Sequence, residues 1–315
     1  MLDGISHALE LFFGNMIMKS MSEQQVAGAP ECFERETWIV VSDLDGTLLD
    51  HYSYSPEDAR PALDLLRQLD MPLILNTSKT LRETLDIASE IGVRSPLIVE
   101  NGGGIFIPKK SAEGKYWAAE DNLIRRKEWI PVGARRADVL KTLKYLKLAR
   151  DLKFTSFDEM TLQGLEMHTG LQRASLHAAL DREFSEPLLW QDSPTNLDWL
   201  SSKLEKAGLQ IVKGGRFHMV SGKHNKGTSL DWMRSFFRTS MNSHVKIIAL
   251  GDSMNDLPML EAADIAICIR SHANPPLKSN QKTIIESSKA GVQGWNESVL
   301  SHLRNLQATP SPAIH

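Results

Sequence analysis

Short apolar runs of strand length alternate along the chain with stretches of helical periodicity. The runs that we interpret as buried strands occupy residues 38–41, 72–76, 97–100, 245–250 and 264–269. Helix starts follow the first two runs. Ser55 and Pro56 fit the N-cap and first position of one helix. Thr80 and Glu83 form the capping box of the next, which should end at Gly92. This alternation predicts an α/β fold built on a Rossmann-like, doubly wound parallel sheet.

The alternation is interrupted in the middle of the chain. After a polar stretch at 109–121, helices are expected at 134–148, 161–169 and 171–183, and strands at 187–190, 209–213 and 216–220. A helix over 226–237 then restores the first pattern. This change in the order of predicted helices and strands predicts a second α/β domain inserted into the first.

These features divide the 315 residues into segments. We expect the main domain at 36–107 and 221–303, the inserted domain at 108–220, an N-terminal extension of possible disorder at 1–35, and a disordered tail at 304–315.

The first strand ends in two aspartates, Asp43 and Asp45, which strand alternation places on the same side. Two carboxylates so close repel each other unless a cation lies between them. Gly46 allows a sharp exit from the strand, and Thr47 offers a hydroxyl and a backbone N–H to an anion. The alternative interpretation of this segment is a plain Asp-Gly turn.

Polar residues also follow other predicted strands or open a predicted helix: Thr77, Ser78, Lys226, Asp252, Asn255 and Asp256. Because ligands of parallel sheets bind beyond the carboxyl ends of the strands, these side chains should meet at one edge. Carboxylates without clustered His or Cys favour a hard cation, above all Mg²⁺. Lysine and hydroxyl donors suit phosphate oxygens. The residues together predict a Mg²⁺–phosphate site.

The pattern resembles the four motifs of haloacid dehalogenase-type phosphatases: Asp43-Leu44-Asp45-Gly46-Thr47, Thr77, Lys226, and Gly251-Asp252-Ser253-Met254-Asn255-Asp256. The long insert after Asn101-Gly102-Gly103 resembles the subgroup with a large α/β cap. Within it the chain is similar to the mannosyl-3-phosphoglycerate phosphatase family, through Thr77-Ser78-Lys79-Thr80, Arg182-Glu183-Phe184-Ser185-Glu186-Pro187 and Gly214-Gly215-Arg216-Phe217.

The resemblance implies a two-step phosphate ester hydrolysis. Asp43 would be the nucleophile that forms an aspartyl-phosphate, and Asp45 the general acid and then the base. Lys226 and Thr77 would bind the phosphoryl oxygens. Lys223 is a less favoured candidate for the lysine.

The resemblance also implies a Mg²⁺ cofactor. Asp43, the main-chain carbonyl of Asp45, and Asp252 would hold the ion. Asn255 and Asp256 would orient Lys226 or water bound to the metal.

The insert is expected to select the substrate. A phosphorylated sugar-glycerate carries a carboxylate besides its phosphate, so an arginine is expected in the cap. The candidate substrate-binding residues are Arg182, Arg216, Ser185 and Glu186 in the insert, and Thr47, Ser78 and Lys79 in the main domain. Each cap residue could instead serve an ordinary surface contact, and Ser78 and Lys79 could merely begin a helix.

The preferred hypothesis is a phosphatase acting on mannosyl-3-phosphoglycerate or its glucosyl analogue. The alternatives are a general sugar-phosphate phosphatase, a phosphomutase, and a non-catalytic binder of phosphorylated metabolites. Intact acids at 43, 45 and 252 argue against the last of these, since a binding protein gains nothing from a nucleophile.

Composition limits the partners and the cellular compartment that we expect for the protein. A net charge of −3 gives no reason to expect nucleic acid or an anionic membrane as a partner. Two cysteines make no disulfide framework, and no apolar run is long enough to span a bilayer. Residues 11–18 are weakly similar to a signal-peptide core, but Asp3 and Glu10 precede them where positive charge is usual. We therefore expect a cytoplasmic protein, with no sequence signal for its oligomeric state.

Overall fold

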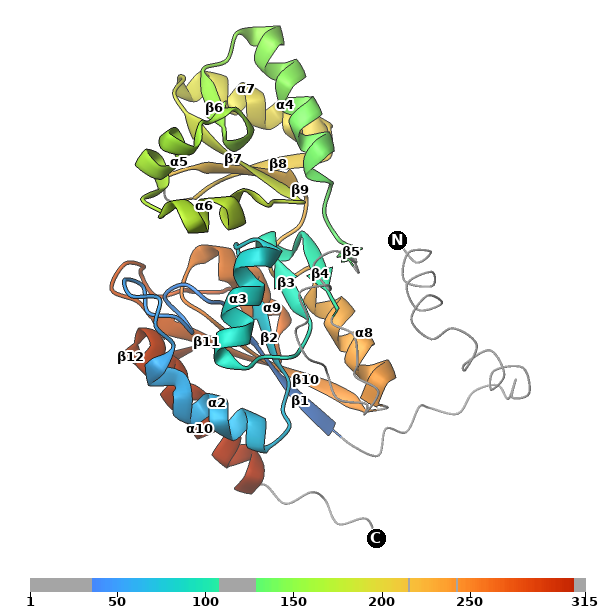
Figure 1. Ribbon diagram of the computed structural model, residues 1–315. Coiled ribbons are helices and arrows are strands. Elements are labelled where there is room, and N and C mark those ends of the chain that lie inside the picture. The colour runs from blue at the N-terminus through green and yellow to red at the C-terminus, as the bar shows by residue number, and fades with distance from the viewer. Residues whose placement is uncertain (1–35, 108–128, 215, 242, 309–315) are drawn as a thin grey trace, which may run out of the picture.

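The computed structural model describes residues 36–107, 129–214, 216–241 and 243–308, and in it the chain forms two sheets (Figure 1). The larger sheet has eight strands, in the spatial order β12 (Ile285–Ala290), β11 (Ile265–Arg270), β10 (His244–Gly251), β1 (Glu36–Ser42), β2 (Leu73–Asn76), β3 (Leu97–Val99), β4 (Gly104–Phe106) and β5 (Trp129–Pro131). The smaller has four, in the order β6 (Phe154–Ser156), β7 (Ser185–Trp190), β9 (His218–Gly222) and β8 (Leu209–Lys213).

The predicted parallel α/β sheet is confirmed from β11 to β3, where neighbouring strands all run parallel, and β12, which was not predicted, adds a further parallel strand beside β11. The strands β4 and β5 extend it in antiparallel fashion and were not predicted. Only a short turn, η2 (Glu100–Gly102), joins β3 to β4, and a turn of that length cannot make a parallel crossover. Since β5 belongs to the larger sheet, residues 129–131 lie with the main domain and not with the insert where the sequence placed them.

Helices cover both faces of the larger sheet, which makes it doubly wound (Figure 1). One face packs against α2 (Arg60–Gln68), α3 (Leu81–Ile91) and α10 (Gly291–Ala308), the other against α8 (Leu230–Met241) and α9 (Leu257–Ala262). The central strand β1 serves both cores, with Val40 in the first and Ile39 and Val41 in the second. This explains why its sequence is apolar throughout instead of alternating.

The smaller sheet is antiparallel and belongs to the inserted segment. The helices α4 (Arg136–Arg150) and α7 (Pro194–Lys206) pack on it around Val139, Leu188 and Leu200, all fully buried. The helices α5 (Leu162–Thr169) and α6 (Arg173–Leu180) lie on the side that faces the larger sheet (Figure 1). In the ranges that the structure describes, no helix has the length and apolar character needed to cross a membrane.

Several boundaries differ from the sequence prediction. A 3-10 turn, η1 (Glu57–Ala59), precedes α2, so Pro56 caps that turn and is not the first residue of the helix. The helix α8 begins at Leu230, later than expected, because the Asn225 side chain accepts hydrogen bonds from the N–H groups of Gly227 and Thr228 and holds 226–229 in a turn.

Other differences concern the length and number of the elements. The helix α6 is shorter than the predicted 171–183, and β6, α7, α9 and α10 were not predicted. The helix α10 continues to Ala308, so 304–308 are not a disordered tail. Two further 3-10 turns are η3 (Phe157–Glu159) and η4 (Met254–Asp256). The predictions for 1–35, 109–121 and 309–315 concern residues outside those described.

Glu100 joins the two parts of the molecule. It adopts a φ of 50° in the turn after β3, and the residue is 1% exposed. Its carboxylate accepts hydrogen bonds from the N–H groups of Glu183 (2.7 Å) and Phe184 (3.1 Å) and from Ser185 Oγ (2.5 Å), at the start of β7. A charged group in the main domain thereby satisfies three donors of the insert.

His224 lies at the same junction and is 3% exposed. Its Nε2 donates to the Glu100 carbonyl over 3.1 Å, so Nδ1 is the bare nitrogen, and Nδ1 is buried with no hydrogen-bond partner among the described residues. Gly103 and Gly133 flank the ring, and a Cβ on them would lie 2.9 Å and 2.2 Å from it. Burial lowers the pKa of His224 below 6.5, because a proton on Nδ1 would have no acceptor.

Thr80 makes a further contact across the junction. Its hydroxyl accepts from the Glu83 N–H at the start of α3 and donates to the Ala178 carbonyl of α6, over 3.3 Å and 2.8 Å. We predict that Thr80→Ala lowers the free energy of unfolding by about 1–2 kcal/mol, since it removes a cap and leaves a buried carbonyl unpaired. Thr80→Ser keeps both bonds and loses only a methyl group, about 0.8 kcal/mol. Urea unfolding measures both; equal losses in the two variants would contradict the assignment.

His224 also makes stability depend on pH. Its folded pKa is below the unfolded value of 6.5, so between these two values the unfolded chain binds more protons and stability falls as the pH is lowered. His224→Gln keeps a donor for Glu100 but cannot titrate. We predict that urea midpoints at about pH 7.5 and 5.5 differ less for this variant than for the wild type. An unchanged difference would show that His224 titrates normally in the folded state.

Candidate active site

The carboxyl ends of three adjacent strands supply the centre of the site. The strands β10, β1 and β2 are neighbours in the larger sheet and run parallel. Asp252 follows β10 directly, Asp43 follows β1, and Thr77 follows β2. All three are buried, at 3%, 5% and 0% exposure. The predicted convergence of strand ends thus brings these residues to one edge.

Lys226 reaches this edge from the turn before α8 and is 1% exposed. Its Nζ donates to Asp43 Oδ1 over 2.5 Å and to Asp256 Oδ1 over 2.6 Å. Its own carbonyl accepts from the Asn76 amide over 2.8 Å, which fixes the main chain at this point. Lys226, and not Lys223, is therefore the lysine of the site; Lys223 lies 4.0 Å from Glu205 and is half-exposed.

Asp256 is occupied on both oxygens. While Oδ1 faces Lys226, Oδ2 accepts from the N–H groups of Asp252 and Ser253 and from Ser253 Oγ, over 3.0–3.1 Å. The bond from the Ser253 N–H is part of the capping box of η4. Asp256 thus holds Lys226 in place and fixes the loop that carries Asp252, which agrees with the expected orienting role.

The electrostatics of the cluster follow from one ammonium facing several acids. Burial, together with the charge of Asp256, raises the pKa of Asp43 to about 8, although Lys226 opposes the rise. Burial and Asp256 also raise the pKa of Asp252. Burial alone would lower the pKa of Lys226, but the carboxylates of Asp256 and Asp43 raise it above the ordinary value. The lysine stays charged, and the cluster has more acid than base.

A bound cation would balance the excess of acidic groups in this cluster. Carboxylate oxygens of Asp43, Asp252 and Asp256 lie within 4.8 Å of one another. Asp256 is committed to Lys226 and η4, so Asp43 and Asp252 are the carboxylates better placed to hold a metal. The donors are all oxygens, which is the ligand set of Mg²⁺.

Asp252 has supports that sequence reasoning did not single out. Asn274 Nδ2 donates to its Oδ2 over 2.9 Å. Asn274 lies in the loop after β11, the next strand along the same sheet edge, and that position was the available signal. Gly46 has φ +77, and a Cβ there would lie 2.9 Å from Asp252 Oδ2, so the sharp exit expected at Gly46 also leaves room for this carboxylate.

Two predicted residues face other partners. The Thr47 hydroxyl donates to Asp252 Oδ1 over 3.4 Å and its N–H to the Leu44 carbonyl, so both donors have partners within the protein and neither is left for a phosphate. Asn255 is exposed, bonds Asn101 Oδ1 over 3.3 Å, and accepts from Ser253 Oγ. The Asn255 side chain therefore links the η4 turn to the turn after β3.

Asp45 stands apart from Asp43. Its Oδ2 pairs with Lys79 Nζ over 2.9 Å, a contact that sequence reasoning missed because it assigned Lys79 to the substrate. The backbone N–H of Lys79 donates to Thr77 Oγ1 over 3.2 Å. Burial alone would lower the pKa of Lys79, but the charge and hydrogen bond of Asp45, together with the charge of Glu83, raise it above its ordinary value.

The candidate substrate residues of the insert divide into two groups. Arg182 and Ser185 lie at the junction, where Arg182 Nη1 donates to Ser185 Oγ over 3.0 Å and lies 3.5 Å from the Ser78 carbonyl. Arg182 Nε is buried without a hydrogen-bond partner in the part of the chain described.

Glu186 and Arg216 instead stabilise the insert. Glu186 is fully buried and accepts from Arg136 Nε over 2.6 Å and from the Asp158 N–H over 2.8 Å. Arg216 is exposed and donates to the His168 carbonyl. Neither side chain is brought to the cluster of acids.

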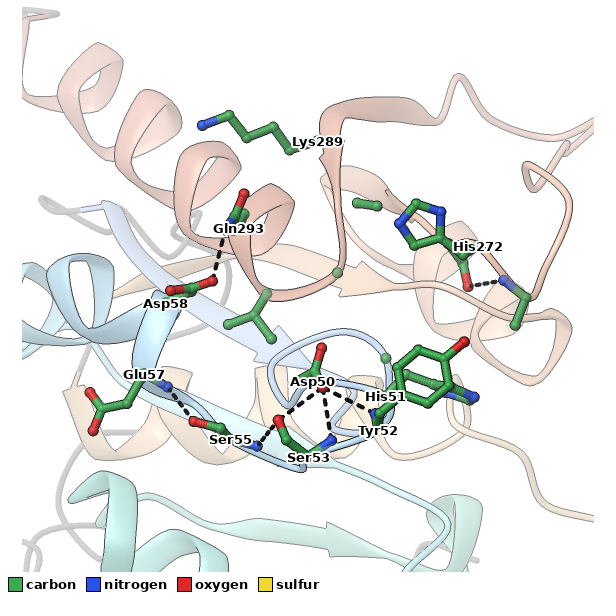
Figure 2. A pocket seen from close by; sticks show the side chains of 16 residues that line it. Asp50, His51, Tyr52, Ser53, Ser55, Glu57, Asp58, His272, Lys289 and Gln293 are labelled. Carbon is green, nitrogen blue, oxygen red and sulfur yellow. Dashed lines mark hydrogen bonds between the residues drawn. The ribbon is translucent and has the colours of Figure 1, made fainter.

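A cavity of about 730 Å³ adjoins the cluster on the side of the 50–55 loop (Figure 2). Its walls include Gly46, Asp50, Ser271, His272, Lys289 and Gln293. Ser271 also hydrogen-bonds Asp252, so the cavity adjoins this candidate metal ligand only through Ser271 and Gly46. Among the residues predicted for the site, none lines it.

Comparisons with known proteins agree with the fold and the motifs. The family model of haloacid dehalogenase-like hydrolases matches residues 40–123 and 188–293. A protein of Persephonella marina named glucosyl-3-phosphoglycerate/mannosyl-3-phosphoglycerate phosphatase is 34% identical over 271 residues, 85% of this chain and 98% of that protein. A protein of the same name from Methanococcoides burtonii is 35% identical over 83% of this chain and 96% of its own length.

The same fold occurs in solved structures. A haloacid dehalogenase-like hydrolase from Bacteroides thetaiotaomicron aligns with a TM-score of 0.58 at 17% identity, over 85% of this chain and 100% of that one. Sucrose-phosphatase from Synechocystis aligns with a TM-score of 0.51 at 15% identity, over 85% and 98%. The chain belongs to the haloacid dehalogenase-like hydrolases, in the branch that includes the glucosyl-3-phosphoglycerate/mannosyl-3-phosphoglycerate phosphatases.

Proposed function

We propose that the protein is a Mg²⁺-dependent phosphatase that hydrolyses mannosyl-3-phosphoglycerate or glucosyl-3-phosphoglycerate to the glycosylglycerate and phosphate. The observation that carries this proposal is the buried contact of Lys226 with Asp43, beside Asp252 at the edge of the sheet. The names of the relatives supply the substrate class. Neither nucleic acid nor a membrane is expected to take part, and the expected compartment is the cytoplasm.

Asp43 is the proposed nucleophile. One of its oxygens, Oδ1, is held by Lys226, which leaves Oδ2 to attack phosphorus in line with the leaving oxygen. The product of this step is an aspartyl-phosphate. Asp45 then has two tasks, to protonate the departing alkoxide and afterwards to accept a proton from the water that hydrolyses the aspartyl-phosphate.

Asp43, the main-chain carbonyl of Asp45, and Asp252 would hold Mg²⁺. When bound, the ion screens the repulsion between the nucleophile and the phosphate and stabilises the charge of the transferring group. A carboxylate raised to a pKa of about 8 in the metal-free cluster needs such a positive neighbour to be ionised near neutral pH.

Lys226 and Thr77 are proposed to bind the non-bridging phosphoryl oxygens. Lys226 is fixed by Asp256 and permanently charged, so little reorganisation is needed when negative charge develops. The Thr77 hydroxyl can still donate, because its contact with Lys79 uses it as an acceptor.

The glycerate carboxylate is proposed to bind at the junction, near Arg182, Ser185, Ser78 and Lys79. The unpartnered Nε of Arg182 supports this location, since a buried guanidinium N–H without an acceptor is costly unless a ligand supplies one. The insert would then determine specificity and exclude water when it closes on the main domain.

A substrate panel tests the assignment. With Mg²⁺ present, kcat/KM for mannosyl- or glucosyl-3-phosphoglycerate should exceed that for hexose phosphates lacking a carboxylate by about a hundredfold or more. The physical reason is that those phosphates supply no carboxylate to accept a hydrogen bond from Arg182 Nε. Equal efficiency across the panel would favour a general sugar-phosphate phosphatase. Phosphate transfer that requires a sugar acceptor would instead identify a phosphomutase.

Asp43→Asn tests the nucleophile. The amide cannot form an acyl-phosphate at a useful rate, so we expect kcat to fall by at least about a thousandfold. Binding of substrate with Mg²⁺, measured by calorimetry, should be largely retained. Asp86→Asn, an exposed position on α3, is the matched control and should have wild-type activity. Substantial turnover by Asp43→Asn would refute the role of Asp43.

A further inference from the structure

The two aspartates of the first motif are each paired with a different lysine. Lys226 contacts Asp43, whereas Lys79 Nζ lies 2.9 Å from Asp45 Oδ2. The side chains of Lys79 and Asp45 are 16% and 37% exposed, so the pair is partly shielded from water and salt. The contact is therefore stronger than an ordinary surface ion pair.

Lys79 is itself held from several sides. Its N–H donates to Thr77 Oγ1, and its carbonyl accepts from the Glu100 N–H over 3.0 Å. Its ammonium lies 5.1 Å from the centre of the Tyr54 ring, within the range of a cation–π contact. The position of the ammonium is thus set by the turn after β2 and by the loop after β1.

The two oxygens of Asp45 have different surroundings. Oδ2 accepts from Lys79, while Oδ1 is buried with no hydrogen-bond partner among the described residues. An ammonium can only donate, so Oδ2 acts as the acceptor, and the proton of the acid form is better placed on Oδ1. A buried carboxyl oxygen without a partner is unusual, and it is suited to a group that arrives with the substrate.

We propose that Lys79 is a positioning residue: it holds Asp45 by an ion pair with Oδ2, so that Oδ1 donates the proton to the leaving group. The proposal rests on the function proposed above, in which Asp45 is the general acid. As Asp43 bonds to phosphorus, the ester P–O bond breaks and its electron pair stays on the ester oxygen. The proton on Asp45 Oδ1 moves to that oxygen, and a neutral alcohol leaves.

A series of substituted phenyl phosphates tests this role, because these esters lack a carboxylate and differ in the acidity of the phenol. Poor leaving groups depend more on a general acid than good ones. Lys79→Met should lower kcat/KM about tenfold for phenyl phosphate but less than about threefold for p-nitrophenyl phosphate. Lys79→Arg retains a donor and should keep the wild-type dependence on the leaving group. Lys79→Gln is a second neutral variant, and circular dichroism confirms folding of each.

Two further variants complete the experiment. Lys153→Met removes a lysine that is 61% exposed and paired with Asp151 in the insert, and it should leave every rate unchanged. Asp45→Asn should make kcat/KM depend more steeply on the acidity of the leaving phenol, at least as much as Lys79→Met does. Suppose that Lys79→Met lowers kcat/KM by the same factor for every ester, while Asp45→Asn lowers it more for the poorer leaving groups. That result would overturn the role of Lys79 but leave Asp45 as the general acid. No steepening in Asp45→Asn would instead refute the general acid itself, and the proposed mechanism with it.

Discussion

The buried ammonium of Lys226 is the constraint on which the centre of this protein depends. Moving such a charge from water into the protein interior costs roughly several kcal/mol. It is tolerated only where opposite charges contact it with good geometry. Asp43 and Asp256 do so from segments far apart in the chain. The ends of β1 and β10 and the turn before α8 must therefore be correctly placed together, because a displaced partner would leave an uncompensated charge in the interior.

The environment separates two aspartates that look equivalent in the sequence. Asp43 is enclosed beside Lys226, and Asp45 is partly exposed beside Lys79. The glycine between Asp45 and Thr47 turns the main chain away from the strand direction and admits Asp252. A nucleophile and a proton donor can thus be two residues apart and still have different partners.

The sequence predicted those parts of the site that local rules control. Asp43, Thr77 and Asp252 each follow a buried strand, and these strands could be recognised from their short apolar runs. Contacts that depend on tertiary packing were not predictable, among them the pairing of Lys79 with Asp45. The same limit applies to Glu186, whose charge is neutralised inside the insert. The strands β4 and β5 are three residues long each, too short to give a periodic signal.

Glu100 has a consequence for how such enzymes diversify. Its carboxylate accepts hydrogen bonds from the main-chain N–H groups of Glu183 and Phe184, in the middle of the inserted segment, and its carbonyl accepts one from His224, in the main domain. An insert taken from another enzyme could be grafted onto this main domain only if it offered donors to the Glu100 carboxylate where β7 begins. Recombination of specificity domains is thus limited by a few hydrogen bonds between the insert and the main domain more than by the catalytic centre.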